Sequence, residues 1–230
     1  MNFLYGMFDP YFLLLVIPAM IFSMWAQSQV TSRFKKYSQQ ATMKGLTGAQ
    51  AADAVLRGNG VTDVTIERIA GNLTDHFDPR TNVIRLSDSV HDSTSVAAVG
   101  VAAHEAGHAL QYANGYAPMK LRAAIIPVTN IGSKLSMPLV LIGLIMSMDG
   151  LINIGILLFS TVVLFQLITL PVEFNASSRA LNILDNSALL TRDELPDARR
   201  VLSAAALTYV GAMAVSLAQL IRLIAMSRRR

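Results

Sequence analysis

Cysteine is absent from this chain of 230 residues. Disulfide bonds are therefore excluded, and so are the thiolate ligands that hold many structural zinc ions. Any metal ion must be bound by histidine, by carboxylates and by water.

Charged residues are also scarce. They make up 15% of the chain, whereas charged residues make up about 25% of a typical soluble protein. Hydrophobic residues make up 53%. The apolar residues form long runs, so insertion into a membrane explains the composition. The formal net charge of +4 comes largely from arginine and lysine near the ends of these runs. No motif that interleaves basic and aromatic residues accompanies this charge, which argues against a nucleic-acid partner.

Histidine is rare, with four in the chain, and two of them lie in the pentapeptide His104-Glu105-Ala106-Gly107-His108. In a helix, residues four positions apart project from one face, so both imidazoles can bind one metal ion. Glu105 projects about 100° away from His104. Its carboxylate is then beside the metal ion, where a base can take a proton from water.

A surface helix that happens to carry two histidines is the alternative to this metal site. The residues that flank the motif are small and apolar, however, which indicates a buried helix, and buried imidazoles need a partner. The pattern therefore predicts a site for one catalytic Zn2+ ion, with His104 and His108 as ligands and Glu105 as the catalytic base.

The whole chain predicts a mainly α, multi-pass membrane protein with about four apolar spans and a small α+β zincin-like catalytic region. The expected organisation is an N-terminal membrane anchor (1–30), a catalytic region (31–122), a two-span membrane hairpin (123–171), a helix expected to supply the third metal ligand (the third-ligand helix, 172–200) and a C-terminal membrane helix (201–230).

Local patterns predict the elements before and after the motif helix. A helix over 47–56 and strands over 64–69 and 82–87 precede it, and Asp92 or Ser93 can cap its start. The second strand is either scaffold or an edge that binds an extended peptide. The span over 123–148 holds prolines and polar residues, so a kinked or partly re-entrant helix is expected.

Basic residues set the expected orientation in the membrane. Several follow the first apolar run (11–27) directly, which places them on the cytoplasmic side; they are Arg33, Lys35, Lys36 and Lys44. Two further spans bring 172–200 to the same side, so the site is expected at the cytoplasmic face of the cell membrane. The C-terminal helix departs from this rule, because the arginines at 228–230 end outside if it crosses the bilayer. It either spans nevertheless or lies along the interface.

A catalytic zinc ion usually has three protein ligands, so a third must come from a later segment. Glu173 is the leading candidate, because a carboxylate between Val172 and Phe174 at the mouth of a span is costly without a partner. A carboxylate that simply faces water is the alternative. Asp149 is the rival ligand, in a Met-Asp-Gly turn similar to that of intramembrane site-2 proteases. It lacks their preceding prolines, and the charge-based topology places it on the opposite face of the membrane.

Two long segments, 96–111 and 170–180, resemble the YugP-like membrane zinc metallopeptidases of bacteria, and the likeness covers most of the chain. More distantly, the order of elements is similar to that in HtpX-type and CAAX prenyl proteases. The resemblance implies a gluzincin in which His104, His108 and Glu173 bind the zinc ion.

One departure from those distant relatives lies next to the third ligand. They carry Glu-x-x-Ala-Asp, and Ser177 stands here in the place of the aspartate, so the contacts of that aspartate are not carried over. Arg179 is either an oxyanion stabiliser or the partner of Asp185 in a surface ion pair.

The sequence thus predicts a zinc-dependent endopeptidase that acts on polypeptides, expected to be membrane or misfolded proteins, in contact with the lipid bilayer. It carries no signal for an oligomeric state. The alternatives are a zinc-stabilised membrane scaffold without turnover and a site-2-type intramembrane protease that uses Asp149. The presence of Glu105 argues against the scaffold.

Overall fold

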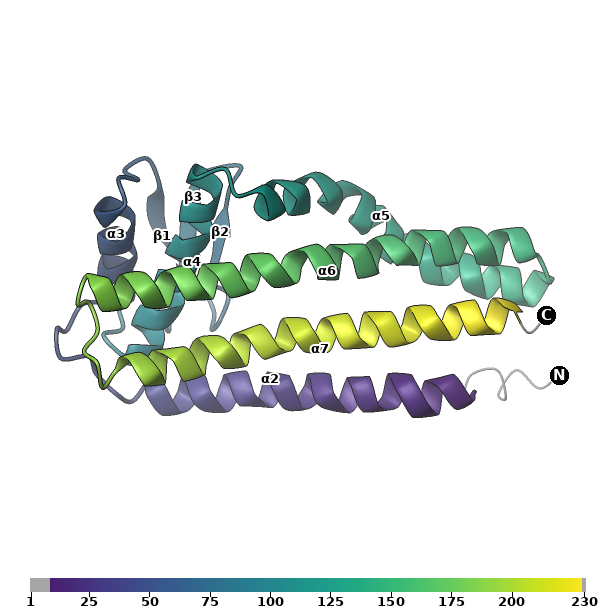
Figure 1. Ribbon diagram of the computed structural model, residues 1–230, viewed down its shortest axis with the longest axis horizontal. Helices are drawn as coiled ribbons and strands as arrows, with labels where there is room; N and C mark the ends of the chain where they lie inside the picture. Colours follow the sequence, from purple (N-terminus) through teal and green to yellow (C-terminus); the bar gives the residue numbers. More distant parts are fainter. Residues whose placement is uncertain (1–8, 229–230) are drawn as a thin grey trace. The chain divides into compact units, whose positions relative to one another are not determined.

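The structure is a computed structural model, and it describes residues 9–228 of the chain (Figure 1). In chain order, its elements are the π-helical turn η1 (Phe12–Val16), α2 (Ile17–Tyr37), α3 (Gly48–Gly58), β1 (Thr65–Ile69), β2 (His76–Asp78), β3 (Val83–Ser87), α4 (Val96–Ala113), α5 (Ala117–Met146), α6 (Asp149–Asn186) and α7 (Leu195–Arg228). The predicted fold class, mainly α with a small α+β region, is therefore confirmed.

Four helices of the described chain are long and apolar enough to cross a membrane. They are Phe12–Tyr37, Ala117–Met146, Asp149–Asn186 and Leu195–Arg228. These spans agree with the predicted multi-pass membrane protein. Arg229 and Arg230 at the end of the last predicted span lie outside the described residues, as do residues 1–8 of the predicted N-terminal anchor.

Contacts between residues divide the described chain into two compact units. The helical unit contains the described residues up to Ala26, Leu121–Leu170 and α7 from Leu207 onward. The mixed unit contains Gln27–Lys120 and Pro171–Ala206, and thus the sheet, the motif helix and the segment around Glu173.

Small residues let the helices of the helical unit approach closely. A Cβ atom on Gly211 of α7 would lie 2.9 Å from the Cα atom of Ser23 in α2. One on Gly155 of α6 would lie 2.8 Å from the carbonyl oxygen of Ser136 in α5. Neither position has room for a side chain, and such backbone contacts are typical of helix pairs in membranes.

Arg222, which interrupts the last apolar run, is paired within the helical unit. Its Nε lies 2.6 Å from Asp9 Oδ2, and both side chains are 11% exposed. Its guanidinium also lies over the ring of Phe12, 4.8 Å from the centroid. A charge in an apolar helix is costly unless it is paired, so Asp9 explains why α7 tolerates an arginine here.

The span that follows the motif helix is one helix, α5, with Pro127 and Pro138 inside it. It bends part-way along its length (Figure 1), as expected where prolines remove N–H donors from the helix. The expected kink is therefore present, in a helix that is continuous from Ala117 to Met146.

The sheet has the order β1-β3-β2, with β1 parallel and β2 antiparallel to β3. β1 and β3 match the predicted strands within one residue, whereas β2 was not predicted. β3 is paired on both sides. The expectation that the strand before the motif helix offers a free edge to a peptide is therefore wrong, and the edges of this sheet are β1 and β2.

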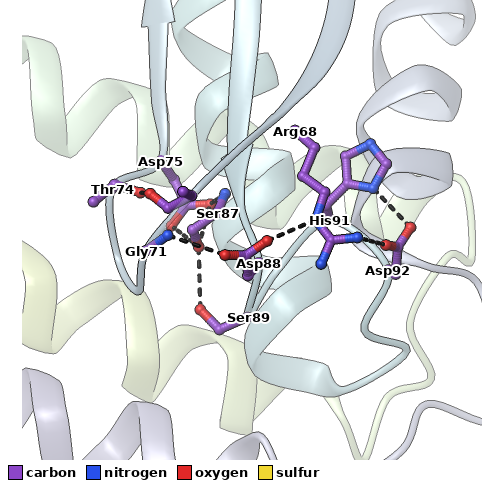
Figure 2. A network of polar contacts seen from close by, with 10 residues as sticks. Arg68, Gly71, Thr74, Asp75, Ser87, Asp88, Ser89, His91 and Asp92 are labelled. Carbon is purple, nitrogen blue, oxygen red and sulfur yellow. Dashed lines mark hydrogen bonds and ion pairs between the residues drawn. The ribbon is translucent and has the colours of Figure 1, made fainter.

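A network of polar contacts fixes the ends of β1 and β3 (Figure 2). Asp75 accepts hydrogen bonds from the backbone N–H and the hydroxyl of Ser87, at 2.8 and 3.1 Å. Asp88 accepts one from Arg68 Nε at 2.7 Å and one from the backbone N–H of Gly71 at 3.1 Å. These bonds tie both strand ends to the turns around them, so the chain leaves the sheet toward α4 from a fixed position.

The motif helix α4 begins later than predicted. Its N-cap is Ser95, whose hydroxyl accepts a hydrogen bond from the backbone N–H of Ala98 at 3.2 Å. The predicted caps, Asp92 and Ser93, are therefore wrong. The reason lies far away in the sequence, because Ser95 pairs with Ala41 in an antiparallel bridge. That bridge keeps the backbone extended as far as Ser95.

Candidate metal centre

Two helices of the mixed unit carry the predicted metal ligands. His104 and His108 lie one turn apart on α4, and Glu173 lies on α6. A Cβ atom on Gly107 would lie 2.8 Å from the carbonyl oxygen of Ala176, so the backbone of α6 lies directly against α4. Because Gly107 has no side chain, the two helices can approach this closely.

The three predicted ligand side chains converge. Glu173 Oε2 lies 3.3 Å from His104 Nε2 and 3.4 Å from His108 Nε2. One donor atom from each residue lies within 4.8 Å of the other two. Ligands bound about 2.1 Å from a tetrahedral zinc ion are about 3.4 Å apart. The spacing therefore fits one tetrahedral ion, and two histidines with one glutamate form a set that catalytic zinc sites use.

Burial makes this cluster depend on charge compensation. The side chain of Glu173 is 2% exposed, and that of His108 is 9% exposed. Burial alone would lower the pKa of His108, but its hydrogen bond to Glu173 and the charge of that carboxylate raise this pKa above its usual value. The buried carboxylate thus attracts positive charge, either as a proton on an imidazole or as a cation.

Gln111 fixes the tautomer of His108. Its Nε2 donates to the carbonyl oxygen of Val172 at 2.8 Å and to Asn175 Oδ1 at 3.0 Å. Because a carbonyl oxygen only accepts, the amide NH2 must face α6, and Gln111 Oε1 must face His108 Nδ1, 3.0 Å away. His108 Nδ1 therefore carries a hydrogen, and Nε2 is the atom directed at Glu173. Nε2 donates a hydrogen to that carboxylate when the imidazole is protonated, and it offers its lone pair to a cation when the imidazole is neutral.

Ser177 has the equivalent place beside His104. Its hydroxyl oxygen lies 3.1 Å from His104 Nδ1. When Nε2 of His104 offers its lone pair to a cation, Nδ1 carries the hydrogen and donates it to Ser177 Oγ. A serine thus supports the first histidine in the place where the distant relatives have an aspartate.

The other predicted site residues lie as follows. Glu105 is 8% exposed and directly follows His104 in α4, and its negative charge acts on His108. Asp149 is exposed at the first position of α6. It precedes Glu173 by 24 residues, or about 36 Å of helix, so the structure does not bring it to the cluster.

Arg179 is a neighbour of the centre through Asn175. Its Nε donates to Asn175 Oδ1 at 2.7 Å, and its guanidinium lies 5.9 Å from the ring centroid of Tyr116. The partner that the structure gives it is thus Asn175, and of the two alternatives for Arg179 the ion pair with Asp185 is not formed among the described residues. Arg179 thereby extends the chain of contacts that begins at His108 and Gln111.

Comparisons with known proteins identify the family. The family described as "putative neutral zinc metallopeptidase" matches residues 12–228. The chain belongs to this family. A similar protein is the "Putative membrane protease YugP" of Bacillus subtilis (strain 168), which is 47% identical over 213 residues that cover 93% of this chain and 95% of the relative. No solved structure matched the chain. The resemblance carried by 96–111 and 170–180 is thereby confirmed.

A zinc metallopeptidase needs supports for its histidines, and the sequence analysis missed both. Gln111 follows His108 by three residues and so lies on the same face of α4, which is a signal that the sequence holds. Ser177 follows Glu173 by four residues and lies on the same face of α6. Neither position indicates by itself that Gln111 will bind the backbone of α6 or that Ser177 will meet an imidazole of α4.

The contact at Gly107 leads to a test. Gly107→Ala places a methyl group against the backbone of α6, so the helices must separate and Glu173 must retreat from the histidines. We expect zinc affinity to fall at least about tenfold, as when supports of a metal site are lost, with a stability loss of about 1–3 kcal/mol. Zinc competition with a chelator and thermal unfolding in detergent measure the two effects.

Gly100→Ala on the same helix is the matched control. Its Cβ would lie 3.5 Å from the Cβ atom of Ala198, which is an ordinary contact. Zinc affinity should stay unchanged there, and stability should not fall, since alanine favours a helix over glycine. Equal zinc affinity of the Gly107→Ala protein and the wild type would contradict the role of the close approach.

Proposed function

We propose that this zinc metallopeptidase is a membrane-embedded endopeptidase in which His104, His108 and Glu173 bind one zinc ion. The observation that carries the proposal is the convergence of their donor atoms: Glu173 Oε2 lies 3.3 and 3.4 Å from the two Nε2 atoms, and a donor atom of each residue lies within 4.8 Å of the other two. Membership of the family supports zinc and peptide hydrolysis as the chemistry. When bound, a zinc ion lowers the pKa of a water molecule and polarises the scissile carbonyl group.

Glu105 is the catalytic base in this proposal. A buried carboxylate one residue after a ligand accepts a proton from the attacking water and passes it to the leaving amine. Gln111 and Ser177 keep the hydrogens of the two imidazoles on Nδ1, so both Nε2 lone pairs remain available to the metal ion. These residues act through the ligands, and they touch no reacting atom.

The proposed site faces the cytoplasm, and its proposed substrates are membrane or misfolded polypeptides. The basic residues after the first apolar run support this orientation. The predicted grouping of a catalytic region (31–122) with a third-ligand helix (172–200) is part of the proposal. The mixed unit supports that grouping, since it combines most of both segments.

Glu105→Gln tests the base. The amide keeps the size of the side chain and loses the oxygen that accepts the proton, so we expect turnover to fall about 10²- to 10⁴-fold with zinc content unchanged. Metal analysis and cleavage of casein or a membrane substrate measure both. Glu67→Gln, at an exposed position of β1, is the matched control and should cleave normally. Near-normal cleavage by Glu105→Gln would show that another group is the base, whereas a wild-type protein that binds zinc and cleaves nothing would favour the zinc scaffold.

Glu173 and Asp149 are separated by a second pair of variants. Without the carboxylate of Glu173 only two imidazoles remain, so Glu173→Ala should lose zinc and activity together, with affinity at least about 100-fold lower. Glu173→Gln should also lose zinc, because a neutral amide is a weak ligand. Asp149→Ala should keep both properties. Stoichiometric zinc in Glu173→Ala together with zinc loss in Asp149→Ala would favour a site-2-type intramembrane protease.

The orientation is tested with single cysteines, which the natural chain lacks. A cysteine at Ser38, just after α2, should be shielded from a membrane-impermeant thiol reagent in intact cells. One at Gly150, in the first turn of α6, should react. After lysis both should react, which controls for burial. The reverse pattern in intact cells would place the catalytic side outside.

A further inference from the structure

A hollow rich in arginine lies in the mixed unit, away from the metal centre. It has a volume of about 640 Å³, and residues near the end of α2, the end of α6 and the beginning of α7 line it. Asn182 on its wall follows Glu173 by nine residues, or about 14 Å of helix. We call it the arginine hollow, after the charged residues that line it: Arg33, Arg192, Arg199, Arg200 and Asp185.

The charges of the arginine hollow do not balance. Four arginines line it, and Asp185 is the one acidic residue among its lining residues. Arg200 pairs with Asp197, with its Nη1 2.5 Å from Oδ1. Among the residues that the structure describes, Arg192 and Arg199 form no ion pair, and both are exposed. The hollow therefore keeps a net positive charge that no other residue of the described chain neutralises.

The hollow also lies where the apolar stretches of two helices end. Arg33 follows the apolar run of α2 (11–27), and Arg199 and Arg200 directly precede the apolar run of α7 (201–226). Residues at the ends of spanning helices lie in the headgroup layer of the bilayer. The phosphates of lipids occupy that layer, and anionic lipids attract basic residues there.

We propose that the arginine hollow binds the phosphate group of an anionic membrane lipid. The planar guanidinium forms paired hydrogen bonds to two phosphate oxygens. In the described chain, Arg200 pairs with Asp197 and Arg33 Nε donates to Gln29 Oε1, whereas Arg192 and Arg199 make no such bond. Leu195 and Pro196 on the wall belong to the first turn of α7, whose positive dipole end also favours an anion. The site does not depend on the proposed peptidase activity.

The test uses the purified full chain in neutral detergent, titrated with short-chain phosphatidylglycerol and followed by thermophoresis. The double variant Arg192→Gln/Arg199→Gln should bind this lipid about 30-fold more weakly than the wild type, since each guanidinium contributes about a factor of five. Arg57→Gln/Arg80→Gln removes the same charge from exposed positions outside the hollow and should bind as the wild type does. Thermal unfolding checks that all of these proteins are folded.

Further arms of the experiment distinguish the source of the phosphate. Phosphatidylcholine of the same chain length should bind much more weakly than phosphatidylglycerol, and so should sodium phosphate. Arg192→Lys/Arg199→Lys should restore part of the affinity, because lysine keeps the charge and loses the paired geometry. Equal losses in both glutamine double variants, or equal affinity for the two lipids, would overturn the proposal. Sodium phosphate that binds as tightly as phosphatidylglycerol would make this a site for a soluble anion.

Discussion

The close contact between α4 and α6 is the constraint on which the metal centre depends. Gly107 lets the backbone of α6 approach α4, and this approach brings Glu173 to two imidazoles in a place with almost no access to solvent. A carboxylate so deeply buried is costly unless positive charge is close to it. Binding of a cation and close packing of the two helices therefore stabilise each other, as is general for metal sites that folding assembles.

The periodicity of a helix placed His104 and His108 on one face, the cost of charge beside apolar residues pointed to Glu173, and the three side chains converge in the structure. Both arguments use local information. The cap of α4 could not be found in this way, because Ser95 is held extended by Ala41, far away in the sequence. β2 has only three residues, with one buried residue between two half-buried ones. That pattern is too short to predict a strand, so pairing with β3 makes it one.

Gln111 and Ser177, which hydrogen-bond to the histidines, show why the detailed contacts of the candidate metal centre could not be predicted from the sequence. Gln111 is useful only because the carbonyl oxygen of Val172 faces it from the other helix and thereby orients its amide. The substitution of serine for aspartate at position 177 suggested the loss of a support. The hydroxyl is instead close enough to His104 to accept its hydrogen, because the approach of α4 and α6 decides which side chains suffice.

Charge pairing also changes how the last helix is understood. The positive-inside rule counts each arginine near a span as a separate charge, and by that count α7 is a poor candidate to cross the bilayer. Arg222 is not a separate charge, since it is paired with Asp9, which precedes η1, and Gly211 of α7 packs against Ser23 of α2. A helix that lay along the membrane interface would not be expected to contact the N-terminal segment at two positions so far apart in the sequence as Gly211 and Arg222. These contacts therefore support a membrane-spanning α7. The carboxylate of Asp9, from the other end of the chain, lowers the cost of placing the charge of Arg222 in that helix.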